Sequence, residues 1–116
     1  MRALLLSLVI LMSLSTPAWS ETMDNLVEKN DLFYNKFTEQ HPFSGKVTGK
    51  SQGRVKDGRK EGLWEYYYDN GQLEHKGNYK DGKKEGLWEC YKKNGQLYRT
   101  RTYKDGIEIS CTGEGC

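Results

Sequence analysis

Few side chains in this sequence have the type and spacing that catalysis requires. The two histidines, His41 and His75, lie in different segments, and each is expected to be a solvated residue rather than a base or a metal ligand. Asp57, Asp81 and Asp105 recur at a fixed spacing, but each precedes a glycine, where an aspartate favours a turn over a catalytic carboxylate pair. We therefore predict that the protein is not an enzyme and has no active site, cofactor or metal ion.

The three cysteines, Cys90, Cys111 and Cys116, indicate a disulfide rather than a metal site. The residues between Cys111 and Cys116 include two glycines, so this short loop can close and the pair is a candidate disulfide. Cys90 is then left as a free thiol. Because no histidine is placed to act as its base, we expect a small buried side chain rather than a nucleophile.

Two pairs of basic residues recur one repeat apart and form the first candidate binding surface. Arg59 and Lys60, with Lys83 and Lys84, would stack into a ladder of positive charge suited to anionic lipid headgroups or an acidic partner. A glutamate follows each pair, so the alternative is a solvated surface of mixed charge.

Tyrosines form the second candidate surface. Tyr67 and Tyr91 hold equivalent positions and, with Tyr66, Tyr68 and Tyr98, would make an aromatic strip that stacks on sugar rings or grips a peptide. The alternative is that these rings pack in the core without any ligand.

The charge balance argues against a nucleic-acid partner. Lys and Arg number 18 against 16 Asp and Glu, a net charge of +2, so phosphate backbones are not strongly attracted to the chain. Aromatic residues make up 12% of the sequence, enough to build a core from rings.

Residues 1–20 have the pattern of a cleaved signal peptide. Arg2 precedes an apolar run over residues 3–14, and small residues, Ala18 and Ser20, stand before the predicted cleavage point. The alternative is a retained membrane anchor, but a spanning helix needs about 20 apolar residues. We therefore expect export to the periplasm or beyond the cell.

Internal repetition organises the remainder of the chain. Residues 53–76 and 77–100 align without gaps at a period of 24 and agree at 15 of 24 positions, and residues 101–109 begin a third copy. We predict a repeat domain over residues 43–110, preceded by an arm and a degenerate first hairpin over residues 21–42. Residues 111–116 form a tail that contains two cysteines.

Dipeptides that favour tight turns recur in each repeat and predict the fold. Asp-Gly at 57–58, 81–82 and 105–106 and Asn-Gly at 70–71 and 94–95 favour type I′ hairpin turns. The runs between these turns favour strands over residues 63–68, 73–80, 87–92 and 97–104. The sequence therefore predicts an all-β fold, an antiparallel meander of hairpins. Met23, Leu26 and Val27 have helical spacing, so residues 21–31 are predicted as a short helix or a frayed arm.

Alternation along the strands selects the core. Trp64, Tyr66 and Tyr68 should share one face, with Leu63 and Tyr67 on the other. The predicted core comprises Trp64, Tyr66, Leu73, Tyr79, Trp88, Cys90, Leu97 and Tyr103.

The run Gly-Leu-Trp-Glu-x-Tyr-x-x-Asn-Gly-Gln-Leu, followed by Tyr-Lys-Asp-Gly-Lys-Lys-Glu-Gly, resembles the MORN-repeat variant of bacterial proteins. The resemblance covers residues 43–106. It implies a sheet of β-hairpin repeats, a protein or membrane-lipid partner, and no enzymatic residues. Some similar proteins carry an antitoxin-like label. We therefore expect an exported, non-enzymatic scaffold that binds a protein. The alternatives are a module for anionic lipid or cell-wall glycan, and an antitoxin-like partner of a toxin.

Overall fold

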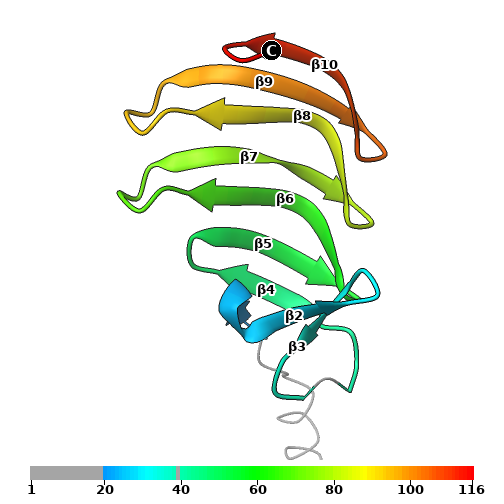
Figure 1. Cartoon of the computed structure of the whole chain (residues 1–116). Helices are drawn as coiled ribbons and strands as arrows, with labels where there is room; N and C mark the ends of the chain where they lie inside the picture. The colour runs from blue at the N-terminus through cyan, green and yellow to red at the C-terminus, as the bar shows by residue number, and fades with distance from the viewer. Residues whose placement is uncertain (1–19, 39) are drawn as a thin grey trace, which may run out of the picture.

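The computed structural model describes residues 20–38 and 40–116, and these residues form one large sheet and one separate hairpin (Figure 1). The predicted signal peptide lies outside the described residues except for Ser20. The strands are β1 (Ser20–Thr22), β2 (Leu26–Lys29), β3 (Leu32–Asn35), β4 (Gly45–Thr48), β5 (Ser51–Lys56), β6 (Arg59–Tyr67), β7 (Leu73–Lys80), β8 (Lys83–Tyr91), β9 (Leu97–Lys104) and β10 (Ile107–Gly113).

The large sheet follows the order of the chain from β4 to β10, and each of these strands pairs antiparallel with the next. β1 adds to the outer edge of β4 in parallel. The predicted all-β meander is therefore confirmed. β2 and β3 pair only with each other and form a two-stranded hairpin in front of the β4 end of the sheet (Figure 1).

The Asp-Gly turns have the predicted geometry. Asp57, Asp81 and Asp105 take φ angles of 49°, 50° and 50°, and the glycine after each is also left-handed. Two consecutive residues with positive φ define a type I′ turn, whose twist matches that of the flanking strands. These three turns join β5 to β6, β7 to β8 and β9 to β10.

The prediction of type I′ turns at Asn-Gly is wrong. Gly71 has a positive φ of 86°, but Asn70 does not have a positive φ. Tyr68 N–H donates to the Gln72 carbonyl at 2.8 Å, and Gly71 N–H donates to the Tyr68 carbonyl at 3.0 Å. This is a three-residue loop, a type I turn followed by a left-handed glycine. The Asn70 side chain accepts a hydrogen bond from Gln72 N–H at 2.9 Å, which holds the loop.

The N-terminal segment is mostly extended rather than helical. Its helical part is one 3₁₀ turn, η1 (Met23–Asn25). Asn30 and Asp31 then turn the chain with φ angles of 51° and 64° between β2 and β3. Leu26 is only 8% exposed, because β2 lays it against the large sheet. Tertiary packing therefore overrides the helical spacing of the apolar residues.

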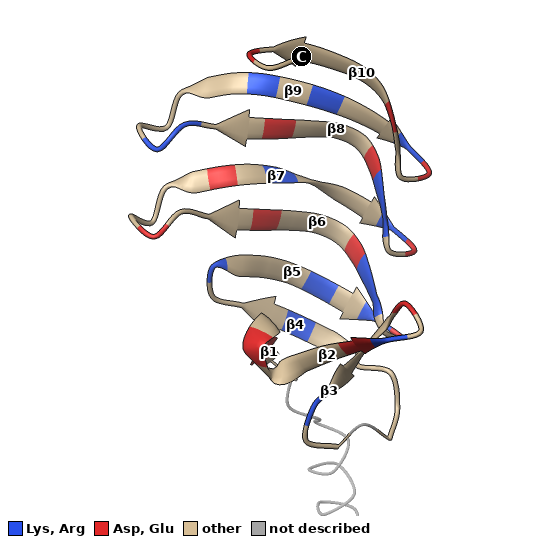
Figure 2. Cartoon of the chain, in the orientation of Figure 1, with Lys and Arg blue, Asp and Glu red and all other residues tan. Residues whose placement is uncertain are grey.

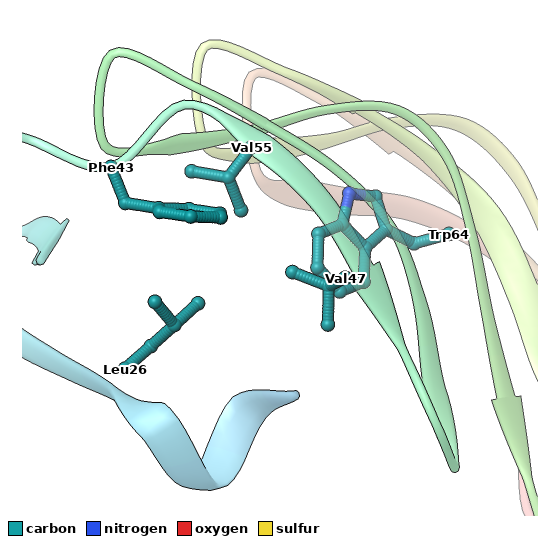
Figure 3. Close-up of a cluster of buried hydrophobic side chains, with 5 residues drawn as sticks. All are labelled: Leu26, Phe43, Val47, Val55 and Trp64. Carbon is teal, nitrogen blue, oxygen red and sulfur yellow. The ribbon is translucent and has the colours of Figure 1, made fainter. Parts of the chain in front are cut away.

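The buried core gathers where the hairpin covers the sheet. Trp64 is fully buried, and Val47 and Val55 beside it are 0% and 1% exposed. Leu26 and Phe43 close the cluster from the opposite side (Figure 3). Of these five residues, the sequence predicted only Trp64. Leu26, Phe43 and Val47 lie outside the aligned copies, and Val55 stands in the first copy at the position that Tyr79 holds in the second.

Several predicted core residues are less buried because the sheet is a single layer beyond the hairpin. Leu97 is 46% exposed, so its assignment to the core is wrong. It pairs with Tyr91 beside the second Asn-Gly loop, at the uncovered end of the strands. Cys90 is half-buried rather than buried. Trp88 is 2% exposed, and the other predicted core residues are half-buried: Tyr66, Leu73, Tyr79 and Tyr103.

Candidate functional site

Trp64 and Trp88 lie on the same face of the sheet and start two equivalent clusters of rings. We call this surface the ring face; its rings are Trp64, Tyr66, His75, Tyr79, Trp88 and Tyr103. Tyr66 stacks on His75 with ring centroids 4.3 Å apart, and Tyr79 meets Trp88 edge-to-face at 5.1 Å. Offset stacking and edge-to-face packing are the preferred arrangements of aromatic pairs.

Each tryptophan ring lies flat over a glycine of the preceding strand. A Cβ atom on Gly53 would overlap the indole of Trp64, and one on Gly77 would overlap the indole of Trp88. The indole N–H of Trp64 donates to the Arg54 carbonyl at 3.0 Å, and that of Trp88 donates to the Asn78 carbonyl at 3.2 Å. Glycine at these positions therefore allows the rings to reach the backbone.

Lys60 and Lys84 lie over the rings, which the predicted ladder did not anticipate. Lys60 Nζ is 4.8 Å from the centroid of Trp64 and donates to the hydroxyl of Tyr66 at 2.9 Å. Lys84 Nζ is 4.7 Å from the centroid of Trp88. These are cation–π contacts. Burial lowers the pKa of Lys60 below its ordinary value, because the charged form loses solvent.

Arg59 and Lys83 point to the other face, because neighbouring residues of a strand alternate. Both are exposed, and their stems pack against Gly82 and Gly106 of the next turn along the sheet. The structure therefore does not bring the four basic residues into one ladder.

Glu61 and Glu85 join successive turns, a role that sequence analysis missed. The Glu61 carboxylate accepts a hydrogen bond from Asp81 N–H at 2.9 Å, and Glu85 accepts one from Asp105 N–H at 2.9 Å. Backbone bonds run beside them, from Gly82 N–H to the Lys60 carbonyl at 3.0 Å and from Gly106 N–H to the Lys84 carbonyl at 2.9 Å. The sequence contains a pattern that could have indicated this role, because each glutamate stands twenty positions before the aspartate whose N–H it accepts.

Comparison with protein-family models gives two matches, residues 60–81 and 84–105, both to the family described as MORN repeat variant. The chain carries two MORN repeats of the variant type. Comparisons with curated proteins and with solved structures found no match. The first MORN repeat contains Lys60 and Trp64, and the second contains Lys84 and Trp88 at the same positions.

Loss of one turn-to-turn bond is expected to weaken the stack of MORN repeats. Glu85→Ala should lower the free energy of unfolding by about 1 kcal/mol, since it removes a charge-assisted bond at an exposed site. Glu85→Gln keeps an acceptor and should lose less. Urea melts of both variants measure this, with Glu89→Ala, on the same strand at a position aligned with Lys76 rather than with the next turn, as the control. Equal stability of Glu85→Ala and the wild type would contradict the role of Glu85.

The β2–β3 hairpin covers the ring face of the first MORN repeat, and we call residues 26–35 the lid. Phe33 N–H donates to the Gly58 carbonyl at 2.8 Å, and its ring lies 5.8 Å from Lys60 Nζ. Leu26 joins the cluster around Trp64. No described part of the chain covers the second MORN repeat in this way.

The uncovered part of the ring face is basic. Arg99 and Arg101 belong to β9, and Figure 2 shows basic residues along this strand. The register aligns Cys90 with Arg99 and Trp88 with Arg101, which places both arginines on the ring face with Lys84. Glu108 lies 3.2 Å from Arg101 Nε. The register places Glu108 opposite Tyr103 on this face, and the Glu74 carboxylate lies 2.9 Å from Nδ1 of His75.

The opposite face has mixed charge and contains two of the predicted surface residues. Glu65 pairs with Lys76, and Lys76 pairs with Glu89, so charges alternate across the strands. Tyr67 and Tyr91 are half-buried on this side, and burial is the largest cause of their raised pKa values. They are therefore separated from the rings of Trp64 and Trp88, and the predicted aromatic strip is divided between two faces.

A disulfide joins Cys111 to Cys116 at the end of the chain, with Cα atoms 5.5 Å apart. The tail folds back on β9: Glu114 N–H donates to the Tyr98 carbonyl at 2.9 Å, and the Glu114 carboxylate lies 3.0 Å from Lys92 Nζ. Cys90 is a free thiol aligned with His75. Among residues 20–38 and 40–116, no cluster of three or more metal-ligating side chains occurs, and no helix is long and apolar enough to cross a membrane.

His75 predicts a dependence of stability on mild acid. Burial between Tyr66 and Trp88 lowers the pKa of His75. The Glu74 carboxylate, 2.9 Å from Nδ1 of His75, partly offsets this effect because its negative charge favours the protonated ring. Neutral His75 therefore contributes to the stability of the folded state. This contribution is complete above the unfolded-state pKa of about 6.5 and is lost as the pH falls below it, because the unfolded state binds the proton first. Melts between neutral pH and pH about 5 should show a shallower decline for His75→Gln than for His41→Gln. Identical slopes would contradict this account.

Proposed function

We propose that this MORN-repeat protein is an exported, non-enzymatic binding module whose ring face holds a protein partner. One observation carries the proposal: the lid buries the ring face of the first repeat, whereas none of the residues that the structure describes covers the same face of the second repeat in this way. Trp88 is 2% exposed beneath its neighbours, and Tyr79 and Tyr103 beside it are half-buried, so the second repeat presents a partly exposed aromatic surface. Contiguous apolar surface of this kind is typical of interaction sites.

The charges favour a protein over an anionic lipid surface. Lys60 and Lys84 lie singly over aromatic rings, and Arg101 lies beside Glu108, so the basic groups are set among rings and a carboxylate rather than gathered into a uniform patch for headgroups. The exposed Arg59 and Lys83 stand beside carboxylates, which gives a surface of mixed sign (Figure 2). Rings with a few charged groups around them are typical of protein interfaces.

Export is supported by two independent features. The first 20 residues have the pattern of a signal peptide, and a disulfide such as Cys111–Cys116 is stable in an oxidising compartment. An exported position also disfavours the antitoxin-like alternative, because a toxin that acts in the cytoplasm would not meet the protein.

Photo-crosslinking in the producing cells tests the proposal. Benzoylphenylalanine at Tyr103 reports on the ring face, and the same residue at Leu87, which is 54% exposed, reports on the opposite face. We expect a protein adduct of defined mass from Tyr103 and none from Leu87. No adduct from Tyr103, together with salt-sensitive sedimentation on phosphatidylglycerol vesicles, would replace the proposal with lipid binding.

A further inference from the structure

We propose that the second MORN repeat binds a segment of a partner protein that presents an aromatic ring and a carboxylate to Lys84, as the lid presents Phe33 and Glu28 to Lys60. This inference rests on the proposed function and specifies the chemistry of the partner. The segment would lie over Lys84 and Tyr103, which are half-buried, with Trp88 beneath them.

The two repeats contain the same cradle for a lysine. Lys60 Nζ lies 4.8 Å from the ring of Trp64 and 5.1 Å from that of Tyr79. Lys84 Nζ lies 4.7 Å from the ring of Trp88 and 5.0 Å from that of Tyr103. A surface that binds the lid at one cradle is therefore repeated, almost unchanged, one period along the sheet.

The two cradles differ in what completes them. At the first, the Phe33 ring lies on the lysine and Tyr66 accepts its hydrogen bond. A pocket at the margin of the lid brings Glu28 near Lys60, and the charge of Glu28 partly offsets the cost of burying that lysine. At the second, Cys90 replaces Tyr66, and no described residue stands where Phe33 and Glu28 would be. An incoming ring and carboxylate supply those missing groups.

Charge and occupancy identify the partner as a different, acidic protein rather than a second copy. Arg99 and Arg101 lie beside the second cradle with Lys84, and Glu108 accompanies only Arg101, so an acidic segment is favoured. The lid of another copy is already bound in its own core, where Leu26 is 8% exposed. Releasing that lid would expose the cluster around Trp64.

A cyclic peptide with the sequence of residues 26–35, closed through D-proline and glycine, is a direct probe because an isolated linear hairpin is only marginally stable. It is titrated into the full mature protein, whose own lid remains in place, while the indole N–H signals of Trp64 and Trp88 are followed by NMR. We expect a saturable shift of the Trp88 signal alone. Lys84→Met, which keeps the stem over the rings, should weaken binding roughly tenfold or more.

Matched controls distinguish specific recognition of Lys84 from nonspecific binding of the peptide. Lys83→Ala should leave the affinity unchanged, and peptides in which Phe33→Ala or Glu28→Gln is made should bind more weakly to the unaltered protein. A shift of Trp64 alone, no shift at millimolar peptide, equal affinity of Lys84→Met, or self-association without peptide would overturn the inference. If the Tyr103 adduct nevertheless forms in cells, the proposed function survives and only the chemistry of the partner is wrong.

Discussion

Trp88→Ala is expected to lower the free energy of unfolding by about 3–5 kcal/mol, the usual range for emptying a buried aromatic site. Trp88 is 2% exposed, contacts Tyr79 and Tyr103, and carries Lys84 over its ring. A domain of this size has only about 5–15 kcal/mol of stability in total. The variant should therefore be marginally folded or unfolded at room temperature.

Chemical denaturation followed by circular dichroism measures the effect. Lys83→Ala is the control, because its side chain is exposed at a turn, and its stability should change by no more than about 0.5 kcal/mol. A Trp88→Ala variant that melts like the wild type would show that the ring contributes little to the core. The second repeat would then be held together by its turns and strand pairing alone.

Gly77→Ala is expected to destabilise the protein by about 1–3 kcal/mol, the usual cost of overpacking, although the change adds a single methyl group. That methyl would overlap the indole of Trp88, and the position is paired with Trp64 on the other side. The indole cannot simply move away, because its N–H is bonded to the Asn78 carbonyl.

A double-mutant cycle tests the cause of this loss. If the methyl acts by displacing the ring, Gly77→Ala should cost little in a background where Trp88 is replaced by Leu, and the two changes should be strongly non-additive. Additive losses would instead assign the effect of Gly77→Ala to its own strand. Denaturant melts of the four proteins give both answers.

The period of 24 residues and the Asp-Gly dipeptides were enough to predict the meander, because both act locally. A dipeptide with positive φ at Asp57 and Gly58 sets a tight turn whatever lies far away. The prediction for the Asn-Gly dipeptides was wrong because it used the same local signal. The Asn70 side chain accepts a hydrogen bond from Gln72 N–H, so the loop forms without a positive φ at Asn70. The flanking residues therefore decide between a type I′ turn and a three-residue loop.

The ring face could be predicted only in part. Alternation placed Trp64 and Tyr66 together, but pairing Arg59 with Lys60 as one charged surface ignored that adjacent residues point to opposite faces. A hairpin was predicted within residues 21–42, but its packing over the ring face was not, because the partners of Leu26 are distant in sequence. The position of Phe33 over Lys60 depends on that long-range packing.

Glu61 and Glu85 each accept a hydrogen bond from the backbone of the next turn, so each complete 24-residue unit contains the residue that links it to the following unit. Duplication of such a unit in the gene would lengthen the sheet without a new interface, so the number of units is free to vary in evolution. The last unit lacks this freedom: Arg101 stands where the other copies have glycine, Thr112 stands where they have tryptophan, and a disulfide closes the tail. A unit inserted after residue 76 should therefore be tolerated, whereas one appended after Cys116 would follow a unit in which Ile109 stands at the position of Glu61 and Glu85.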